Sequence, residues 1–296
     1  MTSLVYTALA TPFTEQGDID WNHFEKLLNT QGKAGIHGVV IAGTTGEAPT
    51  LTVQEKLSLI RKACAILPKN CQIMVGTGSN NTNQTLELSR LALEAGANQL
   101  LVVTPPYNKP SIAGLIKHYE AISGLGAPIC LYHVPSRTGQ HLTIEQLKDL
   151  CQIENIKYVK EASNHLAYFS HALLACDATF LTGDDPLFLP SLAVGGSGVI
   201  SVTSNIFPKS MLAIGEHFMK GEVHKAKEKF QILLPFIEVL FCETNPAPLK
   251  SALHAAHLGS NSLRLPMVPV TDQHHLKIKK LFADTIMRLE EEGHLQ

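Results

Sequence analysis

One lysine in an apolar run is the residue of this sequence best suited to covalent chemistry. Lys160 lies in the run Tyr158–Ala162, and lysines are seldom buried in strands unless they are paired or have a function. Desolvation disfavours the ammonium form of a lysine and so supplies a neutral amine that can attack a carbonyl carbon. The alternative is a lysine whose head reaches the surface, a role that we assign to Lys157. We therefore expect Lys160 to form an imine with a substrate.

Two hydroxyls between glycines indicate a binding site for an anion. Thr44 and Thr45 stand in the sequence Gly43–Glu47, where glycine lets backbone N–H groups and hydroxyls approach a carboxylate closely. The same five residues would also suit a tight turn that caps a helix. The motif leaves both interpretations open.

Two tyrosines and an arginine follow other apolar runs. Tyr107 lies in the Pro-rich segment Thr104–Pro110, and Tyr132 and Arg137 lie in Leu131–Thr138. A tyrosine hydroxyl can relay protons while an imine forms, although many tyrosines at such places only pack and donate hydrogen bonds. A guanidinium can hold a carboxylate.

Two later runs offer main-chain groups to the same place. Gly183 follows the run Thr179–Thr182, and Ile200 lies in Gly198–Val202, so their carbonyls could line a site. Asp184 and Asp185 come next to Gly183, and they could equally cap the following helix.

Eight short apolar or β-branched runs recur along the chain, which is typical of repeated strand–helix units. The predicted strands are Val5–Ala10, Gly38–Ala42, Gln72–Gly76, Gln99–Thr104, Ile129–Val134, Tyr158–Lys160, Thr179–Thr182 and Gly198–Val202. The predicted helices between them are Trp21–Ala34, Val53–Ile66, Asn83–Glu94, Ser111–Ser123, Ile144–Cys151, Leu166–Ala175 and Asp185–Val194, with Thr52 and Thr143 as caps. Eight parallel strands predict an α/β protein of the (β/α)₈ TIM-barrel class, with its site at the carboxyl ends of the strands.

The chain continues well beyond the eighth strand. We assign residues 1–206 to the barrel strands and most barrel helices, and residues 207–296 to a C-terminal helical extension that completes the barrel. Prolines predict breaks in the extension at Pro235, Asn245–Pro248 and Pro266–Pro269. No low-complexity linker separates the two parts.

Composition restricts the partners. The net charge of -2 gives no basic field for nucleic acid, and no apolar run approaches membrane-spanning length. The first 13 residues carry no secretory signal pattern, and the six cysteines form no CxxC pair, so we expect a cytoplasmic protein with reduced thiols. The 14 histidines form no ligand motif, so we expect no metal.

Seven motifs in register resemble the 4-hydroxy-tetrahydrodipicolinate synthase family, within the N-acetylneuraminate lyase superfamily of class I aldolases. They are GTTGE at 43–47, VGTGSN at 75–80, PPYNKP at 105–110, YHVPSRTG at 132–139, KEAS at 160–163, TGDD at 182–185 and GVISV at 198–202. The resemblance spans nearly the whole chain.

The resemblance implies a lyase of lysine and diaminopimelate biosynthesis that needs no cofactor. Lys160 would form a Schiff base with pyruvate, and the derived enamine would attack aspartate 4-semialdehyde. The family also implies the remaining roles. Thr44, Tyr107 and Tyr132 would relay protons, with Tyr107 donated by a neighbouring subunit. Thr45 would hold the pyruvate carboxylate, Arg137 would hold the carboxylate of the second substrate, and Gly183 and Ile200 would complete the pocket. A homotetramer, with a dimer as the minimum, is the expected assembly.

Some positions depart from the family pattern. Lysine-inhibited members bind lysine with histidines, a glutamate and a second tyrosine, where this chain has Val53, Lys56, Gln84 and Pro106, although it retains Asn80. Because Lys56 would repel lysine, we expect weak or absent inhibition, and strong submillimolar inhibition in a lysine titration would contradict this. His133 replaces a common asparagine, and the sequence gives no account of its effect.

Two alternatives remain. Another Schiff-base lyase, such as N-acetylneuraminate lyase or a 2-keto-3-deoxy sugar acid aldolase, would use the same lysine. Arg137 favours the synthase, because a semialdehyde that carries a carboxylate needs a cation there. A barrel that binds a 2-oxo acid without catalysis is the second alternative.

Overall fold

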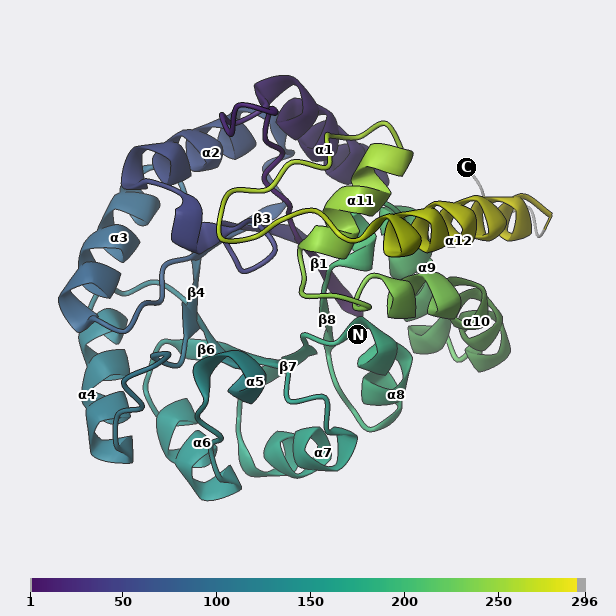
Figure 1. Cartoon of the computed structure of the whole chain (residues 1–296). Helices are drawn as coiled ribbons and strands as arrows, with labels where there is room; N and C mark the ends of the chain where they lie inside the picture. Colours follow the sequence, from purple (N-terminus) through teal and green to yellow (C-terminus); the bar gives the residue numbers. More distant parts are fainter. Residues whose placement is uncertain (1, 292–296) are drawn as a thin grey trace.

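Eight parallel strands close into a barrel at the centre of the molecule (Figure 1). The computed structural model describes residues 2–291. The strands are β1 Leu4–Ala8, β2 Gly38–Ile41, β3 Gln72–Gly76, β4 Gln99–Val103, β5 Ile129–His133, β6 Ile156–Glu161, β7 Thr179–Thr182 and β8 Gly198–Ser201. Each strand pairs with the next along the chain, and β8 pairs with β1. The TIM-barrel prediction is confirmed.

Alternation along the strands decides which side chains fill the barrel. Tyr132 on β5 and Leu181 on β7 belong to the cluster inside the barrel, whereas Leu131 and Phe180 pack outward against the helices. Because successive side chains of a strand point to opposite faces, Lys160 on β6 faces inward and Glu161 outward. Both are buried.

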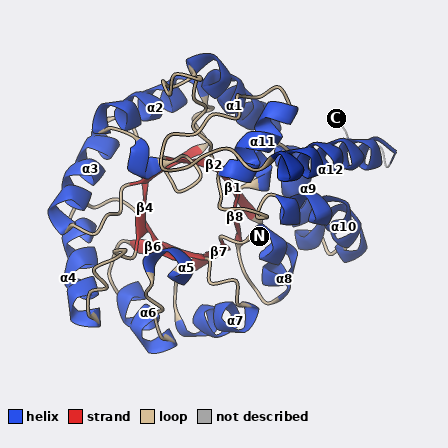
Figure 2. Cartoon of the chain, viewed as in Figure 1, coloured by secondary structure: helices blue, strands red, loops and turns tan. Residues whose placement is uncertain are grey.

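Helices surround the strands in a ring (Figure 2). The ring helices are α1 Trp21–Ala34, α2 Val53–Ile66, α3 Thr82–Glu94, α4 Ile112–Ser123, α6 Ile144–Cys151, α7 Leu166–Ala175 and α8 Phe188–Ala193. Thr52 and Thr143 each accept a hydrogen bond from the third residue of their helix and complete a capping box, as predicted. A four-residue helix, α5 Pro135–Thr138, follows β5 and was missing from the predicted elements.

Between residues 207 and 291, four further helices form the C-terminal part: α9 Pro208–Met219, α10 Val223–Val239, α11 Ala247–Ala255 and α12 Asp272–Glu291. They gather beside β1 and β8 (Figure 1). Phe207, Phe236 and Phe282 pack ring against ring, with centroids 5.1–6.1 Å apart, which joins this part into one core.

The predicted break at Pro235 is wrong, because α10 continues through it. The neighbouring Leu233, Phe236 and Ile237 are fully buried, and their burial offsets the backbone hydrogen bond that proline removes. Pro248 instead stands in the first turn of α11, where proline costs the helix no hydrogen bond. Within residues 2–291, no helix has the length and apolarity needed to cross a membrane.

Candidate active site

Lys160 and Tyr132 lie side by side inside the barrel. They are paired in register on β6 and β5, and the Lys160 Nζ lies 4.3 Å from the centre of the Tyr132 ring. Lys160 is 7% exposed. Within residues 2–291 the Nζ has neither a hydrogen bond nor an ion pair, so the amine is available to a substrate. Lys157, by contrast, is exposed, as expected.

The Gly43–Glu47 loop follows β2 and brings both of its threonines toward the barrel. Thr44 lines the cavity described below, while Thr45 is 3% exposed. The Thr45 Oγ1 accepts a hydrogen bond from the Asn245 Nδ2 at 3.0 Å. The loop is anchored by Glu47, whose carboxylate pairs with the buried Lys250 at 2.9 Å.

Arg137 stands on α5, directly after the strand that carries Tyr132. Its guanidinium Nη2 donates to the backbone oxygen of Asn245 at 3.2 Å. Arg137 also lines the cavity with Thr44 and Tyr132. The cation, the tyrosine and the hydroxyl thus come together as the sequence predicted.

Gly183 lies against Lys160. A Cβ at Gly183 would come within 2.7 Å of the Lys160 Cε and 2.8 Å of the Ala162 Cβ, so the absence of a side chain leaves the lysine its space. Ile200 on β8 is fully buried in the cluster inside the barrel that also contains Tyr132.

Tyr107 is the predicted site residue that a single chain does not bring to the others. It is 89% exposed, and it has a φ of 74°, a left-handed conformation that few tyrosines adopt. Asn108 beside it donates to the backbone oxygen of Asn80 at 2.9 Å, which holds the loop in place. The tyrosine is therefore presented outward.

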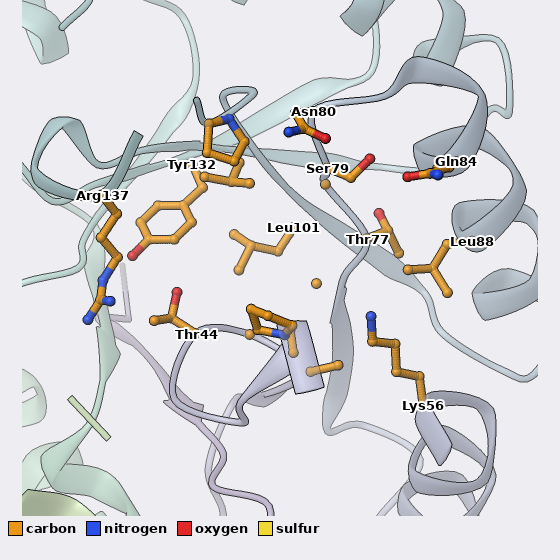
Figure 3. A pocket seen from close by; sticks show the side chains of 18 of the residues that line it. Thr44, Lys56, Thr77, Ser79, Asn80, Gln84, Leu88, Leu101, Tyr132 and Arg137 are labelled. Atoms are coloured by element: carbon orange, nitrogen blue, oxygen red, sulfur yellow. The ribbon is translucent and has the colours of Figure 1, made fainter. Parts of the chain in front are cut away.

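A cavity of about 910 Å³ opens beside these residues (Figure 3). Arg137, Tyr132 and Thr44 lie at one end and Lys56 with Gln84 at the other, and Leu101 lies between them. Within the described residues, the Lys56 amine makes no ion pair. Burial lowers the pKa of Lys56.

The cavity also joins the positions at which this chain departs from the family that its motifs resemble. Val53, Lys56, Gln84 and Pro106 all line it, together with the retained Asn80. Weak lysine inhibition stays a prediction, and these are the residues that an inhibitory lysine would contact.

Asp184 and Asp185 follow Gly183, where the sequence offered them as caps of the next helix. The Asp184 side chain does not cap that helix, and its carboxylate accepts the N–H of Asn164 at 2.8 Å. Burial raises the pKa of Asp184 to about 6; the charges of Glu161 and Asp185 act in the same direction, while the charge of Lys160 opposes them. The Asp185 carboxylate instead accepts hydrogen bonds from Val202 N and from both N–H and hydroxyl of Thr203. Asp185 therefore ties the segment after β7 to the segment after β8, and the TGDD sequence alone did not separate these roles.

His133 has a structural role on the outer side of the strands. Its Nε2 accepts the N–H of Leu142 at 3.2 Å, so its Nδ1 carries the proton and faces the Glu161 Oε1 at 3.3 Å. The same oxygen accepts the N–H of Ser163. His133, which follows Tyr132, is thus joined to Glu161, which follows Lys160, on the outer side of the barrel. Within residues 2–291 no group of three or more metal-ligating side chains converges.

The fold and motifs match one protein family along almost the whole chain. The model of the dihydrodipicolinate synthetase family matches residues 1–285. The chain is 38% identical over 292 residues to the 4-hydroxy-tetrahydrodipicolinate synthase of Leptospira biflexa serovar Patoc, covering 98% of each chain.

Solved structures agree with this match. The synthase of Methylacidiphilum fumariolicum SolV superposes with a TM-score of 0.95 at 38% identity, covering 99% of both chains. The chloride-inhibited dihydrodipicolinate synthase of Acinetobacter baumannii, in complex with pyruvate, has a TM-score of 0.93 at 34% identity over 96% of this chain and 99% of that one. A dihydrodipicolinate synthase variant described as monomeric has the same TM-score and identity, over 96% of this chain and 97% of that one.

Proposed function

The chain belongs to the dihydrodipicolinate synthetase family, and from that premise we propose that it condenses pyruvate with L-aspartate 4-semialdehyde to give 4-hydroxy-tetrahydrodipicolinate. The observation that carries the proposal is the buried, unpaired Lys160 amine, which faces the interior of the barrel beside Tyr132. Since no hydrogen-bond partner among residues 2–291 fixes this amine, it can turn toward the carbonyl carbon of a substrate.

The first half of the reaction activates pyruvate. The Lys160 Nζ attacks C2 of pyruvate, and the carbinolamine loses water to give an imine. Loss of a C3 proton then gives the enamine. Thr44 and Tyr132 move protons during these steps, together with Tyr107 from a neighbouring subunit, because each hydroxyl can accept one proton and donate another.

The second half forms the carbon–carbon bond. The enamine carbon attacks the aldehyde carbon of the semialdehyde, whose oxygen takes up a proton and becomes the 4-hydroxyl. The amino group of the adduct then attacks the imine carbon, the ring closes, and the Lys160 amine leaves. One water is released overall, and neither metal nor cofactor takes part.

Two charged groups of the substrates need partners. Thr45 holds the pyruvate carboxylate, and Arg137 holds the carboxylate of the semialdehyde through N–H groups that its contact with Asn245 leaves free. Gly183 and Ile200 shape the pocket around the imine. Arg137 favours this substrate over a polyhydroxylated aldehyde, which is better served by neutral hydrogen bonds.

The exposed Tyr107 supports an assembly in which two subunits complete each other's sites, and we propose a homotetramer built from such dimers. We place the enzyme in the cytoplasm, where its six cysteines, all of them free thiols here, would stay reduced.

Borohydride trapping tests the proposal. Incubation with pyruvate and borohydride is expected to add the mass of a reduced pyruvate imine to the peptide that contains Lys160, and Lys160→Ala is expected to show none. Lys250 is a built-in control, because it is even more buried, 1% exposed against 7% for Lys160, and its amine donates to two backbone oxygens. An adduct that persists in Lys160→Ala, or no adduct at all, would contradict the mechanism.

The aldehyde partner is tested separately. Enzyme loaded with pyruvate is expected to turn over with aspartate 4-semialdehyde and not with N-acetylmannosamine. The opposite preference would assign the chain to the other Schiff-base lyases of the superfamily.

A further inference from the structure

One residue of the C-terminal part contacts both proposed carboxylate-binding side chains. Asn245 lies between α10 and α11, far from either in sequence. Its Nδ2 donates to the Thr45 Oγ1 at 3.0 Å, and its backbone oxygen accepts from the Arg137 Nη2 at 3.2 Å. Asn245 is 8% exposed. A single buried residue thus links the two sites that are proposed for the two substrates.

We propose that Asn245 is a positioning residue: its side chain sets the hydrogen-bond direction of Thr45 and so determines how tightly the pyruvate carboxylate is held, and its backbone oxygen orients Arg137 for the carboxylate of the second substrate. The inference rests on the proposed function, because it assigns Thr45 to pyruvate and Arg137 to the second substrate.

The direction of the hydrogen bond carries the argument for Thr45. A threonine hydroxyl has one proton to donate and two lone pairs that accept. The amide Nδ2 can only donate, so the Thr45 Oγ1 accepts and its own proton remains free. A carboxylate can only accept. Asn245 therefore keeps Thr45 in the state that a pyruvate carboxylate requires.

The second contact acts on Arg137. This arginine stands on the four-residue helix α5, and its side chain is anchored by the Asn245 carbonyl at one nitrogen of the guanidinium. The remaining N–H groups keep a fixed direction, which reduces the conformational freedom that is lost when a carboxylate binds.

A contribution to fold stability does not explain why position 245 carries an amide side chain. The Asn245 Oδ1 is buried and has no hydrogen-bond partner among residues 2–291. An unsatisfied buried acceptor weakens a fold. The anchoring of this segment is instead provided by Lys250 in α11, which binds Glu47 and the backbone oxygen of Thr11.

Alanine and aspartate at position 245 separate positioning from packing. Asn245→Ala removes the donor, and we expect the pyruvate concentration at half-maximal trapping of Lys160 to rise roughly 3- to 10-fold, the loss of one hydrogen bond. Asn245→Asp is nearly isosteric, but its carboxylate accepts the Thr45 proton and repels the pyruvate carboxylate. We therefore expect a larger rise than in Asn245→Ala. A packing role predicts the reverse order.

The KM for pyruvate is expected to change more than kcat, because Lys160 and Tyr132 are untouched. In a Thr45→Val background, Asn245→Ala is expected to have no further effect on pyruvate. Ser251→Ala is the matched control: it removes one hydrogen bond of α11, to the His275 Nδ1 at 2.8 Å, without touching the site. It is expected to leave the half-saturating pyruvate concentration unchanged.

The outcomes distinguish the two proposals. If the wild-type enzyme traps pyruvate but Asn245→Asp is no worse than Asn245→Ala, the positioning role of Asn245 is wrong and the proposed function stands. If the wild-type enzyme traps no pyruvate, the proposed function fails, and the role of Asn245 fails with it.

Discussion

Lys160 and Lys250 are both buried, but their hydrogen-bond surroundings differ. Lys250 donates to the backbone oxygens of Thr11 at 2.6 Å and Ser262 at 3.0 Å, and it pairs with Glu47 at 2.9 Å. Burial lowers the pKa of Lys250, while the charge of Glu47 and its hydrogen bond oppose this. The Lys160 Nζ lies over the face of Tyr132 and makes neither a hydrogen bond nor an ion pair among residues 2–291. Burial alone therefore does not identify a nucleophile, and the hydrogen-bond partners do.

Asp184 gives the protein a pH-dependent stability that one substitution should remove. Its native pKa, raised to about 6 by burial, lies above the usual value of 3.8. The native state thus binds the proton more tightly than the unfolded state, so the contribution of Asp184 to stability falls as the pH rises from about 4 to about 6 and stays low above.

We compare the free energy of unfolding of Asp184→Asn with that of the wild type. As the pH rises from 4 to 7, we expect the difference to change by about 2 to 3 kcal/mol in favour of Asp184→Asn, which is the pKa shift of Asp184 converted to free energy. Urea denaturation of both proteins at the two pH values measures it. A difference between the proteins that is the same at both pH values would show that Asp184 does not titrate in this range.

At the scale of elements, the loop after β2 depends on α11, through the pair between Glu47 and Lys250. Both side chains are at most 2% exposed, and Glu47 has a φ of 55°. Its second carboxylate oxygen accepts the N–H of Arg264 at 3.1 Å. The loop that carries Thr44 and Thr45 is thus held by residues more than 200 positions away.

We expect Lys250→Met to destabilise the protein by about 3 to 5 kcal/mol, because it leaves the Glu47 carboxylate buried without a cation. Lys250→Met combined with Glu47→Gln is expected to recover part of that loss, since no charge then remains buried. Thermal or urea unfolding of the two variants gives the comparison. A double variant less stable than the single one would contradict this account.

Regular elements were predictable from the sequence, and irregular ones were not. All eight strands lie within two residues of the predicted runs, because each buried strand is a short apolar run between turns. Helix α5 was missed, since four residues cannot show a helical period, and Arg137 lies there. The break predicted at Pro235 was wrong, because the burial of its neighbours stabilises the helix by more than the lost backbone hydrogen bond destabilises it.

The site was predictable where it follows strand ends. Lys160, Tyr132, Thr44 and Arg137 come together as expected. Asn245 was not found, because a lone asparagine before a proline indicates only a turn, and its partners lie 108 and 200 residues away. Contacts at such separations are properties of the closed barrel and leave no local pattern in the sequence.

At the scale of the whole molecule, the exposed Tyr107 raises the question of whether one chain forms an active site alone. We expect Tyr107→Phe and Lys160→Ala each to be nearly inactive alone. If a neighbouring subunit donates Tyr107, one site of each mixed dimer combines an intact Lys160 with an intact Tyr107 from the partner.

We expect such mixtures, after dissociation and reassembly, to recover up to about a quarter of the wild-type activity, the share of sites with both residues in random pairing. Homodimers of each variant, treated in the same way, are the controls. No recovery in mixtures that have exchanged subunits would place Tyr107 and Lys160 in the same chain's site.

The division into a barrel, residues 1–206, and an extension, residues 207–296, stays a prediction, and the contacts bear on how separable the two parts are. Asn205 bonds to the backbone of Ala8 and Ala10, and Lys250 to that of Thr11. The end of the first strand is thus fastened by residues on both sides of the boundary. We propose that the two parts do not fold independently.

The late position of Asn245 and Lys250 has a consequence for synthesis. A ribosome makes the chain from its N-terminus, so all eight strands, together with Lys160, Thr45 and Arg137, exist before residue 245 emerges. Until then Glu47 has no cation and Thr45 no amide donor. A polypeptide that ended in this interval would contain Lys160, Thr45 and Arg137 but lack the contacts of Asn245 with Thr45 and of Lys250 with Glu47, so the loop after β2 would not be held as it is in the folded protein.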